Sequence, residues 1–104
     1  MNGNELISFQ IISAVGTARS MYVEAIQEAK KGNIQAAKQL IEDGVKVFVD
    51  GHHAHASLIQ KEAAGEKSEL GLLLMHAEDQ LMTTETLKIV AEEFIELYSD
   101  KYHQ

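Results

Sequence analysis

Not one of the 104 residues of this chain is proline. Proline often ends or kinks an α-helix, because it lacks an N–H donor and its ring clashes with the preceding turn. Glycine-containing stretches divide the chain instead, at residues 30–33 and 64–68. Each has the basic residues and the glycine typical of a helix C-terminus, followed by Asn33 or Ser68 as a candidate N-cap. The sequence therefore predicts three long helices, at about residues 4–31, 33–64 and 69–101.

Apolar residues recur along each segment at spacings of three and four, the period of one face of an α-helix. No strand–helix–strand alternation or glycine-rich phosphate loop is present. Short connections force neighbouring helices to run antiparallel. We therefore expect one domain over residues 1–104, an all-α, antiparallel up-down-up three-helix bundle. The predicted core positions are Ile7, Ile11, Ala14, Ala18, Met21, Ala25 and Ala29; Ile34, Ala37, Ile41, Val45, Phe48, His52, His55 and Ile59; and Leu70, Leu73, Ala77, Leu81, Thr84, Leu87, Ala91, Phe94 and Tyr98.

Composition excludes several classes of protein. Hydrophobic residues make up 45% of the chain, which is too many for a disordered segment. No run of about 18 apolar residues could insert into a membrane, and the N-terminus lacks the pattern of a secretion signal. The absence of cysteine excludes disulfides and a cysteine nucleophile, and it fits a cytoplasmic protein. The net charge of −7 argues against a nucleic-acid partner, which requires a basic surface.

The negative charge is concentrated in the last third of the chain. Residues 69–104 carry eight carboxylates and two lysines, whereas residues 1–32 are neutral overall. Complementary charge speeds association and selects partners. This segment is therefore predicted to attract a basic protein and to discourage small anions.

The third predicted helix has a second apolar face besides its core positions. A helix of a small bundle needs to bury only one face, so the extra one predicts a contact between subunits. The alternative is one broad stripe that faces the core of the same chain. Met75 and Met82, with the leucines near them, are interpreted as core packing. The second face consists of Leu72, Met75, His76, Asp79, Thr83, Val90, Phe94 and Leu97.

His76 and Asp79 are the candidate functional pair, because they lie three residues apart on one side of this helix. Burying ionisable groups among apolar residues costs several kcal/mol unless a partner compensates. Imidazole is nucleophilic when neutral and titrates near neutral pH, which suits the transient transfer of a phosphoryl group. Asp79 could then orient the ring or hold a cation. The structural alternative is a core histidine hydrogen-bonded to a carboxylate.

A second histidine pair, His52 and His55, lies on the predicted core side of the second helix. Together with His76 and Asp79 it has the ligand types of a metal site built from two helices. No His-Glu-x-x-His or Glu-x-x-His motif is present, so the pattern is weak. Two non-catalytic alternatives stay open: a metal-binding or regulatory module that uses these four residues, and a structural adaptor bundle.

Four segments match the motifs of one protein family. They are Gly16–Thr17–Ala18–Arg19–Ser20 with Glu24–Ala25, His52 with Leu58–Ile59–Gln60–Lys61–Glu62–Ala63, the leucine run into His76-Ala-x-Asp79-x-Leu81-Met82, and Glu93–Phe94–Ile95–Glu96–Leu97–Tyr98. From about Phe9 to Tyr98, the chain resembles the enzyme IIA components of the lactose/cellobiose (chitobiose) branch of the bacterial phosphoenolpyruvate-dependent sugar phosphotransferase system.

This resemblance implies an activity and an assembly. Members of the family are homotrimers of three-helix protomers. Their motif histidine, His76 here, accepts a phosphoryl group from the phosphocarrier HPr and passes it to a cysteine of a cognate enzyme IIB. Their motif aspartate, Asp79 here, gathers with its two symmetry mates around a divalent cation, usually Mg²⁺, so that each trimer shares one ion. The sugar taken up would be a β-glucoside disaccharide of the cellobiose, chitobiose or lactose type, with cellobiose favoured.

The chain departs from the family pattern in two places. The usual motifs are His-Ala-Gln-Asp-His-Leu-Met and, before the Leu-Ile, Ala-His-x-x-Gln-Thr. Gln80 can donate a hydrogen bond to a phosphoryl group but cannot act as an acid. His55, with His52 near it, could supply an imidazole to the site from the neighbouring helix. The departing residues are Glu78 and Gln80 in the first motif, and Gly51, His55 and Ala56 in the second.

Overall fold

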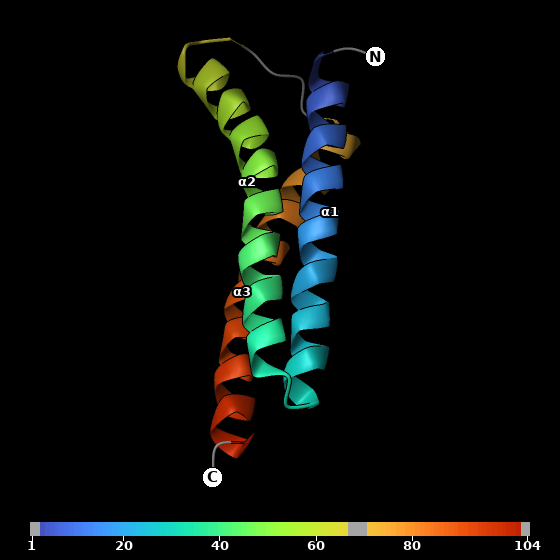
Figure 1. Ribbon diagram of the computed structural model, residues 1–104. Helices are drawn as coiled ribbons and strands as arrows, with labels where there is room; N and C mark the ends of the chain where they lie inside the picture. The colour runs from blue at the N-terminus through green and yellow to red at the C-terminus, as the bar shows by residue number, and fades with distance from the viewer. Residues whose placement is uncertain (1–2, 67–70, 103–104) are drawn as a thin grey trace.

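The computed structural model describes residues 3–66 and 71–102, and within them the chain forms three α-helices and no strand. Helix α1 spans Gly3–Lys30, α2 spans Ile34–Ala63 and α3 spans Leu72–Tyr102. Figure 1 shows α1 and α2 running side by side in opposite directions, with α3 behind them and parallel to α1. The predicted all-α, up-down-up bundle is therefore confirmed. No described helix is both long enough and apolar enough to cross a membrane.

Helices α1 and α2 both end at a glycine with a left-handed backbone, as the glycine-containing stretches predict. Gly32 has a φ of +88° and Gly65 a φ of +89°, a region that favours a residue without a Cβ. In each turn the glycine N–H and the following N–H donate to carbonyls of the last helical turn, at 3.0 Å. These paired bonds are the Schellman motif, which satisfies carbonyls that the helix leaves free.

The beginnings of α2 and α3 differ from the prediction. Asn33 precedes α2 as expected, but its side chain makes no capping bond. Its Nδ2 donates instead to Oε2 of Glu28, at 2.8 Å. Helix α3 begins at residue 72 rather than 69, and the Gly71 carbonyl accepts its first bond from the Met75 N–H, at 3.1 Å. Ser68, the predicted cap, lies outside the described residues.

The last residue of α3 is bound to the turn between α1 and α2. The Tyr102 hydroxyl donates to the Lys30 carbonyl at 2.8 Å, and a Cβ added to Gly32 would lie 3.1 Å from the Tyr102 ring. The ring therefore lies flush against the glycine turn. This contact fixes the C-terminal end of α3 relative to the other two helices.

The core row of α2 is displaced by one residue from the prediction over part of its length. His52 and Ile59 are exposed, and the helix turns Gly44, Gly51 and Leu58 inward. The prediction of His52 and Ile59 as core residues was wrong, whereas Val45 is partly buried against the core as predicted. On α3, Phe94 is exposed and Ile95 is buried in its place, whereas Leu70 lies outside the described residues. The buried apolar residues are Ile11, Val15, Ala18, Tyr22, Ala25, Ala29, Ile34, Ala37, Ile41, Leu58, Leu74, Ala77, Leu81, Ala91 and Ile95.

The two inward glycines let α1 and α2 approach closely. A Cβ added to Gly44 would lie 2.6 Å from Cε1 of Tyr22, and one added to Gly51 would lie 3.0 Å from Cγ2 of Val15. Tyr22 is only 1% exposed, and its hydroxyl has no hydrogen-bond partner in the described structure. Burial, reinforced by the negative charge of Glu92, raises the pKa of the Tyr22 hydroxyl above its usual value.

The second apolar face predicted for α3 points to solvent in the single chain. Met75 and Met82 are 51% and 61% exposed, so their interpretation as core packing is wrong. A broad core stripe is wrong too, because every member of the predicted second face is exposed and the same turns bury Ala77 and Leu81 instead. We call the outer face of α3 the exposed residues Leu72, Met75, Asp79, Met82, Ile89, Val90 and Leu97.

Gly44→Ala is expected to destabilise the fold by about 1–3 kcal/mol, because the added Cβ would overpack the buried Tyr22 ring. The matched change Gly16→Ala places a Cβ on an exposed part of α1, where it meets nothing from the rest of the chain within 4 Å. It is expected to stabilise by up to about 1 kcal/mol through helix propensity. Urea denaturation followed by circular dichroism measures both, and equal effects would contradict the close approach of α1 and α2.

Candidate functional site

His76 and Asp79 lie in the second turn of α3, and both are exposed. Between them Ala77 is fully buried and anchors this turn in the core. An α-helix turns about 100° per residue, so Asp79 points almost directly away from the core and His76 lies on the flank between core and outer face. The two side chains are neighbours on the helix surface. The interpretation of His76 as a buried structural histidine is therefore wrong.

Gln80 follows His76 by four residues and is partly buried. Residues four apart lie one above the other on a helix, so the amide is on the same flank as the His76 ring. Its predicted support of a phosphoryl group at His76 stays a prediction.

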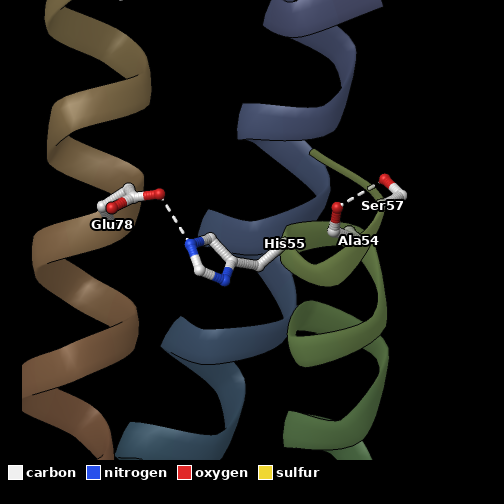
Figure 2. Close-up of polar contacts among 4 residues, drawn as sticks. All are labelled: Ala54, His55, Ser57 and Glu78. Carbon is white, nitrogen blue, oxygen red and sulfur yellow. Dashed lines mark hydrogen bonds and ion pairs between the residues drawn. The ribbon is translucent and has the colours of Figure 1, made fainter. Parts of the chain in front are cut away.

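His55 and Glu78 form a direct contact between α2 and α3. The His55 Nε2–H donates to Oε1 of Glu78, at 2.6 Å. Figure 2 shows the ring extending from α2 across to the carboxylate on α3. The His55 side chain is 16% exposed and the Glu78 side chain 43%. Glu78 therefore lies on the flank of α3 that faces α2, two residues after His76.

The sequence prediction did not find this pair, although it identified both residues as departures from the family pattern. His55 was expected to bring its imidazole to His76, and the structure directs its Nε2 to Glu78 instead. The signal for the pair is that an acid and an imidazole, which can complement each other, stand at two of the departing positions.

Two other histidines of the described residues, His52 and His53, do not join the site. His52 and His53 are exposed on α2, with ring centroids 6.5 Å apart. Within residues 3–66 and 71–102, no three His, Cys, Asp or Glu side chains gather closely enough to hold a metal ion. The predicted four-residue metal site of His52, His55, His76 and Asp79 is therefore not formed by one chain.

The surface around the site is acidic, as predicted. Helix α3 carries seven carboxylates and two lysines. One of these lysines, Lys88, is paired with Glu92 at 3.1 Å within the same helix. Exposed pairs of this kind contribute little to stability, but the net charge of the face sets which partners it attracts.

The arrangement suits a transfer reaction on an open surface. An exposed imidazole can attack an electrophile that a second protein presents, without any opening of the fold. The Asp79 carboxylate is a hard oxygen ligand of the kind that Mg²⁺ prefers. One such group per chain is too few for a metal centre, so a cation at Asp79 would need carboxylates from other copies.

Known proteins similar to this chain share one family description. A family model described as "PTS system, Lactose/Cellobiose specific IIA subunit" matches residues 6–99. The lichenan-specific phosphotransferase enzyme IIA component of Bacillus subtilis (strain 168) is 46% identical over 94 residues, which are 90% of this chain and 86% of that protein. The lactose-specific EIIA component of Streptococcus mutans is 42% identical over 100 residues, 94% of this chain and 96% of that protein. The crystal structure of the cellobiose-specific enzyme IIA from Bacillus anthracis matches with a TM-score of 0.96 at 41% identity, over 100% of this chain and 95% of that one.

Proposed function

The chain belongs to the lactose/cellobiose-specific IIA subunits of the sugar phosphotransferase system, and from this premise we propose that His76 is its transient phosphohistidine. The donor is the phosphocarrier HPr, and the acceptor is a cysteine of a cognate enzyme IIB. The observation that carries the proposal is the exposure of His76 on α3, beside Asp79 and within the motif that the family shares. A partner can reach this ring without any rearrangement of the bundle.

The transfer consists of two displacements at phosphorus. In the first, a ring-nitrogen lone pair of His76 forms a P–N bond while the bond from phosphorus to the carrier's donor atom breaks, and its electron pair stays on that atom. In the second, a cysteine thiolate forms a P–S bond, the P–N bond breaks and His76 recovers its lone pair. A phosphorylated side chain carries about −1.5 to −2 charges, so the acidic surface of α3 favours the onward step.

We also propose a homotrimer formed through the outer face of α3. Residues 72, 75, 79, 82, 86, 89 and 93 recur at alternating spacings of four and three, the repeat that packs helices around a common axis. Several of them are large apolar side chains left in water, with Leu72 83% exposed. Packing three copies along this row would bury them. It would also leave His76, on the flank, at the edge of the interface.

Asp79 is in this row, so three copies of it would converge on the threefold axis. Three carboxylates at close range repel each other unless a cation neutralises them. Oxygen ligands with retained waters suit Mg²⁺. We therefore propose one Mg²⁺ per trimer, held by Asp79 of the three chains, with the neutralisation of these charges as its role.

The proposed sugar is a β-glucoside disaccharide of the cellobiose type. The support is the similarity to the cellobiose-specific enzyme IIA of Bacillus anthracis over the whole chain. We expect the docking face of HPr to be basic, because α3 carries an excess of carboxylates.

His76→Ala is expected to abolish phosphorylation and to leave helical content unchanged, because the side chain is exposed. Incubation with enzyme I, HPr and phosphoenolpyruvate, followed by mass spectrometry of the intact chain, measures the transfer. The control His53→Ala removes another exposed histidine, on α2, and is expected to be phosphorylated like the unaltered chain. Phosphate found on the His76→Ala chain would refute the proposal.

Asp79→Leu is expected to keep or strengthen the trimer and to make it independent of Mg²⁺. The reason is that three converging charges become apolar side chains. Analytical ultracentrifugation with Mg²⁺ and with EDTA measures the mass of both forms, with Asp50→Leu, at an exposed position of α2, as the control. Dissociation of Asp79→Leu to monomers would show that the carboxylates hold the subunits together through the ion.

A further inference from the structure

We propose that His55 is a positioning residue for phosphoryl transfer at His76, and that it acts through its hydrogen bond to Glu78. The inference rests on the proposed function of His76 and adds a residue from a different helix to it. His55 touches neither the reacting ring nor the phosphoryl group in this account. It fixes the direction in which the His76 turn of α3 points.

The position of Glu78 makes this coupling possible. Glu78 is two residues after His76 and one before Asp79, so a single turn of helix carries all three. Residues two apart on a helix point about 200° apart. The carboxylate therefore faces α2, whereas the His76 ring lies on the opposite flank. A bond that holds one flank of this turn fixes the rotation of the other.

The apolar contacts of the same turn hold it against the core without a preferred direction. Ala77 is buried in this turn, between Leu74 and Leu81 of the same core cluster, and apolar packing is non-directional. The bond from Nε2–H of His55 to Glu78, at 2.6 Å, is directional and accepted by a carboxylate. The His55 ring is only 16% exposed, so it has little freedom to leave the contact. The pair therefore adds a directional constraint to the core packing of this turn.

The pair also fixes where the negative charge of Glu78 lies relative to His76. A carboxylate two residues from a phosphohistidine adds a negative charge next to an incoming dianion. Because His55 binds it, the carboxylate is held against α2, on the side of α3 away from the His76 ring. The exposed pair of Lys88 and Glu92 has no comparable role, because both residues belong to α3 and the pair does not connect it to another helix.

The test compares His55→Ala, Glu78→Ala and the double variant with the unaltered full chain. The rate of phosphorylation is measured by mass spectrometry over a range of concentrations of phosphorylated HPr, and kcat and KM here denote the rate constant at saturation and the half-saturating concentration of this donor. Each single variant is expected to lower kcat roughly tenfold, because small displacements of a reacting group cost about that much or more, while KM stays within about twofold. The double variant is expected to be no slower than either single one, since both remove the same bond.

Two further variants distinguish positioning from general structural support. His55→Gln keeps an N–H donor and is expected to stay within about threefold of the unaltered kcat. Glu85→Ala removes an exposed carboxylate two turns further along the same side of α3 and is expected to leave kcat unchanged. Circular dichroism at the assay temperature identifies folded variants. If His55→Ala does not fold, Glu78→Ala still gives the answer, because that side chain is 43% exposed and its removal leaves no buried cavity.

The outcomes distinguish failure of the role of His55 from failure of the proposed function. Unaltered kcat in folded Glu78→Ala, an effect confined to KM, or failure of His55→Gln to restore the rate would overturn the role of His55. The role of His76 would stand in those cases, provided that His76→Ala remains unphosphorylated. Phosphorylation of His76→Ala would instead refute the proposed function, and the role of His55 with it.

Discussion

Helix α3 can bury only one side within its own bundle, and in its second turn that side is Ala77, which is fully buried. The helical period then directs Asp79 away from the core and His76 onto a flank. This placement explains how an ionisable pair is tolerated on an apolar helix, because such a pair needs compensation only when it is buried. Neither residue is buried in the chain, so no internal partner is required. The same placement leaves a row of apolar side chains in water next to the pair, which is the feature on which the proposed trimer rests.

The position of α3 is fixed near both of its ends by bonds to other helices. Tyr102 at its C-terminus donates to the carbonyl of Lys30, the last residue of α1. Glu78, in the second turn, accepts from His55 of α2. Between these points α3 packs against the other helices through buried residues such as Leu81, Ala91 and Ile95. The close approach of α1 and α2 at Gly44 and Gly51 provides the rigid pair of helices against which both bonds act.

The number of helices, their order and their ends near glycine could be predicted from the sequence, because helix period and C-terminal glycines are local signals. The burial of Gly44 and Gly51 on the inward face of α2 could not, because hydrophobicity does not select a glycine for a core. A glycine faces a core only when a neighbouring helix comes very close, and that neighbour, Tyr22 of α1, is distant in sequence. In the site, the exposure of His76 and Asp79 follows from the burial of Ala77. The spacing of the apolar residues predicted that burial correctly. The partner of His55 depended on how α2 and α3 approach each other, which no local pattern encodes.

The two departures from the family pattern at His55 and Glu78 have one physical explanation. The pattern has an amide at both positions, and two amides can bond to each other because each carries a donor and an acceptor. An ionised glutamate opposite an amide keeps only one usable orientation, and an imidazole opposite an amide offers a single N–H in a fixed direction. Either change alone therefore restricts a half-buried contact, whereas the imidazole N–H and the carboxylate together restore a full hydrogen bond at 2.6 Å. In this chain the two residues link α2 to the turn that carries His76, and one partner of the link is a carboxylate.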